Sequence, residues 1–206
     1  MARRRKEARP GEIVSAALAV FSERGFAGAK MEEIAERAGL SKAALYLYFP
    51  SKEEVFRAVV RQAVAPNIEG LRETVLAAQV PFPSLVGMLL ARLAHLATIL
   101  PIGSVAKMVI GESRNFPELA KVWHDDVVQK GVGLLSSLIQ QRQAAGELRE
   151  GDPRIHAFSI MGPMLIGVIW RETFTPVGGA EVDLAALARQ HAETVARGLI
   201  REETRP

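Results

Sequence analysis

Residues 34–49 of this chain read IAERAGLSKAALYLYF, a pattern that predicts two short helices separated by a tight turn. Small side chains at Ala35 and Ala38 would let the first helix pack closely on the second. Gly39 tolerates the positive φ that a tight turn needs, and Ser41 is a suitable N-cap for the second helix. Together these features predict a helix-turn-helix, whose second helix is the right size to lie in the major groove of DNA.

The predicted second helix has one apolar anchor and an outer face of small and polar residues. Leu45 is the candidate anchor, because it can point inward to a core. Helix N-termini attract phosphate through their free N–H groups, so the N-termini after Ser41 and Ser51 are expected to lie near the DNA backbone. The expected DNA contacts from this region are Ser41, Lys42, Ala43, Ala44, Tyr46, Tyr48 and Lys52.

The excess of basic residues is concentrated at the start of the chain. Residues 1–9 hold five basic side chains and one acid, a net charge of +4, whereas the whole chain carries +3. A basic arm on a near-neutral body indicates a localised contact with phosphates or an acidic surface. Two interpretations stay open: a solvated tail, or an arm that contacts phosphates or the minor groove through Arg3, Arg4 and Arg5.

Apolar residues recur at helical spacing along almost the whole chain, and no window alternates convincingly with period two. The first helix is expected to begin after Pro10 and to end at Gly25. The other expected helices cover residues 31–38, 41–49, 51–66, 68–79, 84–100, 102–113, 118–145, 153–173 and 183–202.

The sequence thus predicts an all-α protein of about nine helices, with a seam near residues 61–67. Three parts are expected along the chain. They are the basic arm 1–9, a three-helix helix-turn-helix DNA-binding domain over 10–56, and a larger helical ligand-binding and dimerisation domain over 57–206.

Nothing in the sequence indicates catalysis or a metal site. Cysteine is absent, which excludes disulfides and thiolate ligands. Residues 131–133 lack the third glycine and preceding strand of a dinucleotide motif, and residues 111–115 lack the closing glycine of a nucleophile elbow. His124, Asp125 and Asp126 are adjacent on a predicted helix, so their side chains would point apart. We therefore expect no enzyme, no cofactor and no bound metal.

The chain has no convincing targeting or membrane segment. Its basic run is followed by Glu7, Pro10 and Gly11 rather than by the apolar region of a signal peptide. The apolar runs 85–111 and 155–170 are interrupted by charged residues, histidine or proline, and the second is shorter than the ~20 residues of a membrane-spanning helix. Both are expected to be buried helices, and the protein is expected to be cytoplasmic with no membrane partner.

Residues 10–56 resemble the DNA-binding domain of the TetR family of bacterial transcriptional regulators. The positions that carry the resemblance are Ile34-Ala35, Gly39-Leu40-Ser41-Lys42, Leu45-Tyr46, Tyr48-Phe49 and Ser51-Lys52-Glu53. The resemblance implies that the third helix reads the major groove. The residues that it places near base edges are Lys42, Ala43 and Ala44, and those that it places on the DNA backbone are Tyr46, Tyr48 and Lys52.

Two positions depart from the family pattern. The family often caps its second helix with threonine, where this chain has Ala29 followed by Lys30. A cap and a phosphate-binding hydroxyl are thereby lost, and Lys30 is expected to supply the phosphate contact instead. The glycine that is usual early in the recognition helix is replaced by Ala43, a mild change that could alter base preference.

The resemblance also implies that the C-terminal helices dimerise and hold a small-molecule effector. The segment 108–119 resembles one that is common in a branch of the family. Candidates for an effector pocket are large or polar side chains in apolar segments, and for each of them an ordinary core position is the alternative. They are Met88, His95, Met108, Glu112, Trp123, Met161, Met164, Trp170 and Phe174.

The last two long apolar segments are the candidates for a dimer interface. A helix that is apolar nearly all round is buried on two sides, either by its core and a partner subunit or by a single-chain core. The candidate interface residues are Phe158, Met161, Leu165, Ile169, Leu184, Leu187, His191, Val195 and Leu199. Because one recognition helix makes too few base contacts for useful specificity, we expect a homodimer on half-sites roughly 34 Å apart.

The sequence therefore predicts a ligand-responsive DNA-binding transcriptional regulator. Its expected partners are double-stranded DNA, a second copy of the chain and a small apolar or amphipathic effector. The expected action is repression at a palindromic operator, relieved by the effector. The alternative is a helical ligand-binding or scaffolding protein that keeps the helix-turn-helix only for packing.

Overall fold

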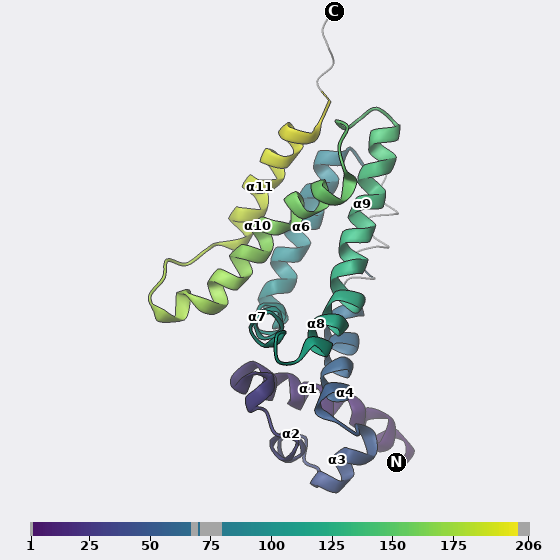
Figure 1. The fold of residues 1–206 in the computed structure, drawn as a ribbon, viewed down its shortest axis with the longest axis vertical. Coiled ribbons are helices and arrows are strands. Elements are labelled where there is room, and N and C mark those ends of the chain that lie inside the picture. The colour runs from purple at the N-terminus through teal and green to yellow at the C-terminus, as the bar shows by residue number, and fades with distance from the viewer. Residues whose placement is uncertain (1, 67–69, 71–79, 202–206) are drawn as a thin grey trace, which may run out of the picture. The chain divides into compact units, whose positions relative to one another are not determined.

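The structure is a computed structural model that describes residues 2–66, 70 and 80–201, with side chains described from residue 10 onward except at 63 and 64. Helices dominate the described backbone (Figure 1), which contains no strand and only one isolated antiparallel bridge, between Leu148 and Ile200. The expected all-α fold is confirmed. The helix expected over 68–79 lies outside the described residues, apart from residue 70.

The described residues up to 66, together with residues 100–127, form one compact unit. Its helices are α1 (Ala2–Gly28), α2 (Met31–Arg37), α3 (Lys42–Tyr48), α4 (Lys52–Val59), α7 (Ile102–Glu112) and α8 (Pro117–Trp123). α7 packs on α1, and α8 packs on α4. Two helices from well beyond residue 57 thus pack with α1 and α4. The division into a DNA-binding domain over 10–56 and a ligand-binding and dimerisation domain over 57–206 stays a prediction.

The first helix begins earlier than the sequence predicted. α1 starts at Ala2, so the expected start after Pro10 is wrong. Proline removes one backbone hydrogen bond inside a helix, but its fixed φ is itself helical, and α1 continues through it. At the expected end, Gly25, the helix is broken by a kink with φ 70° and ψ 175°, and a short helical turn continues to Gly28.

An aromatic cluster lies at the centre of the first unit. Phe21, Phe26 and Phe56 are fully buried, with ring centroids 5.5 to 6.0 Å apart. The ring of Phe116, just before α8, lies 5.0 Å from that of Phe26. Because these rings come from α1, α4 and the start of α8, the cluster ties the end of α1 to both later helices.

Two expected helices are each interrupted by a π-helical turn. The helix expected over 51–66 is α4 followed by η1 (Val60–Val64), and the helix expected over 118–145 is α8, then η2 (His124–Val128), then α9 (Gln129–Ala144). An ion pair joins the two π turns, since Arg61 Nε lies 2.9 Å from Asp126 Oδ2. π turns are frequent at functional sites. Both turns lie close to the points where the chain passes from one unit to the other.

The second unit comprises the described residues of 68–99 and 128–206. Its helices are α6 (Phe82–Ile99), α9, α10 (Pro153–Thr173), η3 (Thr175–Val177) and α11 (Leu184–Leu199). α6 packs on α11, and α10 packs on α9 and α11. Among the described helices, α6 alone is long and apolar enough to cross a membrane, with a mean hydropathy of 1.5. All of its buried side chains except Leu96 belong to the core of this unit, as expected for a core helix.

Candidate nucleic-acid interface

The turn between α2 and α3 has the geometry that the sequence predicted. Gly39 has φ +66°, and its N–H donates to the carbonyl of Glu36 at 3.0 Å. The N–H of Leu40 donates to the carbonyl of Ala35 at 2.8 Å. Ser41 caps α3, because its Oγ accepts the N–H of Ala44 at 3.2 Å. The two helices are therefore held as a helix-turn-helix by backbone bonds and one side-chain cap.

α3 buries one side and presents the other to solvent. Leu45 is fully buried, as expected of the anchor. Ser41, Lys42 and Ala43 are exposed, and Ala44 and Tyr48 are half-buried. Tyr48 packs against the core of the first unit, whereas the more exposed Tyr46 does not belong to it. Most of the expected contact residues thus lie together on or beside the open side of α3.

One exposed residue of α3 was not among the expected contacts. Leu47 is 87% exposed, the largest value among the exposed large apolar side chains of the described residues. Leu47 is two residues after the buried Leu45, which places it close to the opposite side of the helix. The helical spacing therefore indicated that Leu47 would be exposed. The open side of α3 is called the reading face below. An apolar side chain on this face can contact the methyl group of thymine.

Lys42 is paired within the protein. Its ammonium forms an ion pair with the carboxylate of Glu32 on α2. This hydrogen-bonded pairing raises the pKa of Lys42 and lowers the pKa of Glu32. Both side chains are exposed, so DNA phosphate could replace Glu32 as the partner of Lys42.

Lys52 points at backbone carbonyls rather than outward. Its ammonium lies 2.6, 3.3 and 3.0 Å from the carbonyl oxygens of Phe26, Ala27 and Ala29. It also lies 4.5 Å from the centroid of the Phe26 ring. An ammonium has three protons. The three carbonyls can therefore occupy all of them, and the expected phosphate contact of Lys52 stays a prediction.

The start of α2 lacks the cap that the family usually has. Lys30 stands at the N-cap and makes no side-chain cap bond. Ala29 is 3% exposed and lies in the core of the first unit. Lys30 is exposed, as a phosphate contact would need to be. The side chains of Arg3, Arg4 and Arg5 lie outside the described ones, so the role of the arm stays a prediction.

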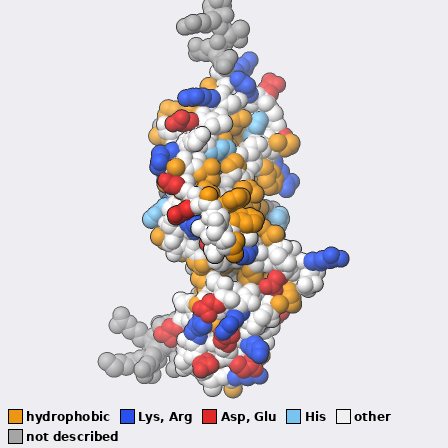
Figure 2. All heavy atoms as spheres, turned by 90° about the vertical axis from the view of Figure 1, so that its left-hand side faces the viewer, with side chains coloured by type: hydrophobic (Ala, Val, Ile, Leu, Met, Phe, Trp, Pro, Cys, Tyr) orange, Lys and Arg blue, Asp and Glu red, His pale blue; other side chains and the backbone are white. Residues whose placement is uncertain are grey.

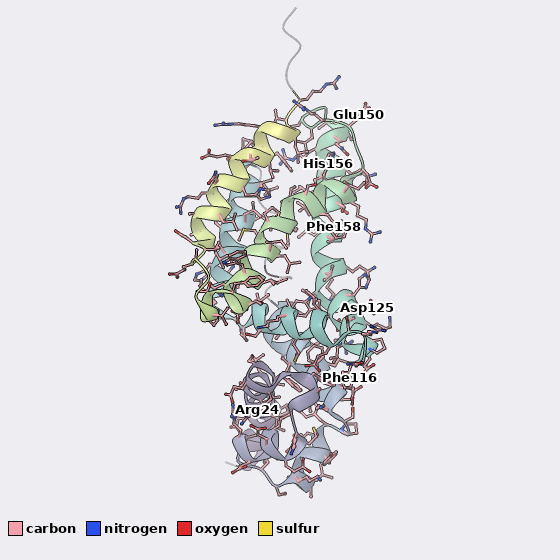
Figure 3. All side chains as sticks on the ribbon, turned by 60° about the vertical axis from the view of Figure 1, so that its left-hand side comes forward. Arg24, Phe116, Asp125, Glu150, His156 and Phe158 are labelled. Carbon is pink, nitrogen blue, oxygen red and sulfur yellow. The ribbon has the colours of Figure 1, made fainter. Side chains whose placement is uncertain are left out.

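Ion pairs also connect α2 to α1. Arg37 binds Glu23 with both guanidinium nitrogens, at 2.6 and 2.9 Å. The hydrogen bond from Arg37 lowers the pKa of Glu23. Arg24 on α1 binds Glu33 on α2 at 3.3 Å (Figure 3 labels Arg24). The position of α2 relative to α1 is thus set by charge pairs as well as by the core.

Glu112, a candidate for the effector pocket, binds the end of α1 instead of standing free. Its Oε1 accepts the N–H of Phe26 at 2.7 Å, and its Oε2 accepts the N–H of Ala27 at 2.6 Å. The bond of Phe26 spans 86 positions of the chain. No local sequence pattern could have indicated this contact.

The other pocket candidates divide between the two units. Met108 and Trp123 belong to the first unit, and the remaining six to the second. Met108 and Met164 are buried in their cores, whereas Met88, His95, Trp170 and Phe174 are exposed. Trp170 donates to the carbonyl of Ala180 at 2.9 Å and pairs with Phe174, with ring centroids 4.9 Å apart. A common pocket stays a prediction.

The dimer candidates on α10 and α11 differ in exposure. On α11, Leu184 and Val195 are buried in the core of the second unit, and Leu187 and Leu199 pack against it. His191 lies 3.1 Å from the carbonyl of Ile160, also within this unit. The core of one chain is therefore enough to account for the apolar stripe of α11.

α10 carries exposed apolar side chains that the core does not account for. Phe158 is 50% exposed (Figure 3), and Leu165 is 46% exposed. Ile155 and Ile166, which were not among the candidates, are both 63% exposed. Met161 and Ile169 are half-buried. Apolar side chains gather on the face of the second unit that carries α10 and α11 (Figure 2).

The helix-turn-helix, with its open α3, defines a DNA-binding transcriptional regulator. Residues 13–59 match the model of "Bacterial regulatory proteins, tetR family", and residues 89–197 match that of the "AefR-like transcriptional repressor, C-terminal domain". The chain belongs to the TetR family. It is a ligand-responsive DNA-binding regulator, so the alternative of a scaffold that keeps the motif only for packing is not supported.

Relatives match the chain over nearly its whole length. The HTH-type transcriptional regulator RutR of Escherichia coli O157:H7 is 30% identical over 221 residues, which cover 94% of this chain and 89% of RutR. A putative TetR-family regulator from Mesorhizobium loti has the same fold, with a TM-score of 0.77 at 24% identity over 96% of this chain and 99% of that one. FadR from Bacillus subtilis, solved in complex with stearoyl-CoA, has a TM-score of 0.71 at 19% identity over 91% and 97%.

Proposed function

We propose that this regulator is a repressor that binds a palindromic operator as a homodimer and is released by a small apolar or amphipathic effector. The observation that carries the proposal is the arrangement of α3, which buries Leu45 completely and leaves Lys42, Tyr46 and Leu47 open. Repression is supported by the description of the C-terminal family, which is that of a transcriptional repressor. We also infer a cytoplasmic protein that acts without catalysis, metal or membrane.

The proposed contacts with DNA fall into two groups. Lys42, Ala43 and Leu47 approach base edges in the major groove, because all three are exposed residues of α3. The other contacts are to phosphates and involve Lys30, Ser41, Tyr46 and Tyr48, with the arm residues Arg3, Arg4 and Arg5 as a further group. Ala44, whose N–H already donates to Ser41, stays among the residues proposed near base edges. Lys52 acts indirectly, through the carbonyls that it binds.

The proposed homodimer uses the exposed apolar side of α10. Ile155, Phe158, Leu165 and Ile166 follow one another at helical spacing, and Gly162 lies between them, where an added methyl group would meet nothing within 4 Å. A second copy of the chain fits this face for two reasons. One recognition helix is too small to specify a site, and an exposed apolar stripe of this kind is typical of an interaction surface.

The proposed effector class follows from apolar candidates and from one relative. Most pocket candidates are methionine or aromatic side chains, which suit an apolar or amphipathic ligand. FadR of Bacillus subtilis was solved with stearoyl-CoA. Long-chain acyl-CoA is therefore the first probe to use. The predicted result is release of the protein from its operator by stearoyl-CoA but not by free coenzyme A.

A selection from random DNA followed by gel shift tests the proposal. The full-length protein should enrich a palindrome with half-sites roughly one helical turn apart. Specific binding should weaken steeply with salt, because phosphate contacts release counterions. Enrichment of no sequence, with binding that salt removes completely, would support the scaffold alternative instead.

A further inference from the structure

We propose that Glu112 is a positioning residue for DNA reading: its carboxylate fixes the turn at residues 25–29, and this turn sets the helices on either side of α3. Glu112 is the last residue of α7. Its printed bonds go to Phe26 and Ala27, which were not among the expected DNA contacts, and it stands far from those contacts in sequence. The inference rests on the DNA-binding function and adds a residue to it.

Both oxygens of the carboxylate accept a backbone N–H at this turn. Oε1 accepts the N–H of Phe26 at 2.7 Å, and Oε2 accepts the N–H of Ala27 at 2.6 Å. Hydrogen bonds from N–H groups to an ionised carboxylate are short and about twice as strong as neutral ones. Two such bonds fix both the place and the direction of the last turn of α1, after the kink at Gly25.

Gly25 lets the carboxylate approach. Its φ of +70° belongs to the left-handed region that favours glycine. A methyl group built on Gly25 would also lie 2.7 Å from Oε1 of Glu112, closer than real side chains pack. The turn is therefore shaped around the carboxylate of Glu112, both in its backbone angle and in the room that it leaves.

A cation holds the same turn from α4. The N–H groups of Phe26 and Ala27 bind Glu112, and their carbonyl oxygens bind the ammonium of Lys52 at 2.6 and 3.3 Å. The ammonium also binds the carbonyl of Ala29 at 3.0 Å. The N–H groups just after the kink at Gly25 are thus bound by an acid from α7, and the carbonyls at the end of α1 are bound by a base from α4.

The turn is next to both neighbours of α3. Ala29 comes directly before the N-cap of α2, and Lys52 is the first residue of α4. The ring of Phe26 lies in the aromatic cluster, 5.0 Å from Phe116, which follows α7 (Figure 3). A shift of α7 would therefore move the start of α2 and the start of α4. α3 is connected to both, so its reading face would move with them.

α7 is also where the chain re-enters the first unit. The chain returns from the second unit at residues 99 and 100, and α7 begins two residues later, at Ile102. α7 is therefore the first helix of the first unit that follows α6 along the chain. Glu112 is thus placed to make DNA reading depend on the position of α7.

The test compares Glu112→Gln with Glu118→Gln, which removes the same charge six positions further along the chain. The glutamine would keep the size of the side chain but place an amide against one of the two N–H groups. We expect Glu112→Gln to weaken operator binding at least tenfold at fixed salt, about 1.4 kcal/mol. Glu118→Gln and binding to random DNA should change less than twofold. Amide hydrogen exchange of Phe26 and Ala27 should accelerate in Glu112→Gln alone.

Circular dichroism and Glu112→Asp separate positioning from simple unfolding. The aspartate keeps the charge, so it should recover part of the operator affinity that glutamine loses. Operator affinity equal to wild type in Glu112→Gln would overturn the proposal. Loss of helicity in parallel with loss of binding in both variants would overturn it too, since Glu112 would then be only structural. Wild-type protein that selects no operator would instead refute the proposed function.

Discussion

Lys42 on the reading helix α3 is held by Glu32 on α2, so the charge nearest to base edges is paired before DNA arrives. The hydrogen bond between them raises the pKa of Lys42 and lowers that of Glu32. Both groups are exposed, so DNA phosphate competes with Glu32 for the ammonium of Lys42.

The first prediction is that Glu32→Gln strengthens DNA binding. Removing the competing carboxylate frees Lys42 for phosphate or base, and we expect an affinity gain of roughly two- to fivefold at low salt. Glu36→Gln is the matched control, because Glu36 is an exposed acid on the same helix with no ion pair to Lys42. Fluorescence anisotropy with a labelled operator measures both. Equal gains in the two variants would mean that only net charge matters.

The second prediction separates the two lysines of this region by salt dependence. Lys42→Met should lower the slope of log K against log salt by about one, because it removes a cation from the DNA surface. Lys52→Met should leave the slope unchanged and lower the free energy of unfolding by about 1–2 kcal/mol, because the carbonyls of Phe26 and Ala29 lose their donor. A smaller slope for Lys52→Met would instead restore this residue as a direct phosphate contact.

The third prediction concerns sequence preference. Leu47→Ala should lower operator affinity about three- to tenfold through loss of apolar contact with one or two base pairs, and leave binding to random DNA unchanged. The melting temperature should not change, because the side chain is 87% exposed. Ile110→Ala, at 59% exposed on α7, controls for loss of an exposed apolar group. Selected sites of Leu47→Ala that match those of the wild type would show that Leu47 reads no base.

Local chemistry explains what the sequence could and could not predict. The turn at Gly39 and the cap at Ser41 depend only on residues within a few positions. The sequence could therefore predict the positive φ of Gly39 and the N-cap formed by Ser41. The bonds from Glu112 and Lys52 join residues 86 and 26 positions apart, which no periodicity reveals. The apolar stripe of α11 was ambiguous for another reason. A helix side that packs on the core of its own chain has the same apolar pattern as one that packs on a partner subunit.

The fourth prediction concerns pH and the second unit. Glu147 accepts the N–H of Phe82 at 2.9 Å and binds Arg142 at 2.7 Å. Partial burial raises the pKa of Glu147, but the bonds from Phe82 and Arg142 outweigh it and keep the pKa below its ordinary value of 4.5. A lowered pKa means stability that is present above about pH 4.5 and lost as pH falls through the lowered value.

Glu147→Gln should therefore be less stable than wild type at pH 7, by about 1–2 kcal/mol. Its stability should also fall less between pH 5 and pH 3, because the carboxylate that titrates there is gone. Urea unfolding at several pH values measures both effects. Glu150→Gln, an exposed acid three positions further on, is the control. If the free energy of unfolding changed with pH in the same way in Glu147→Gln and wild type, the carboxylate of Glu147 would not be the group that titrates.

The last prediction concerns the dimer. Phe158→Glu places a charge in the middle of the exposed apolar side of α10, where a partner would have to desolvate it. We expect sedimentation analysis to find a dimer for wild type and a monomer for this variant at micromolar concentration. Operator binding should fall by at least a hundredfold, because two linked half-sites become two independent weak ones.

Val177→Glu is the matched control for this change. Val177 is 79% exposed in η3, outside the α10 face, and the substitution adds the same charge to the same unit. It should leave both the dimer and operator binding intact. Helicity should be equal in all three proteins, because Phe158 is half exposed and outside the described core. A Phe158→Glu protein that remains dimeric would move the interface off this side of α10, while loss of the dimer in Val177→Glu would place it over η3.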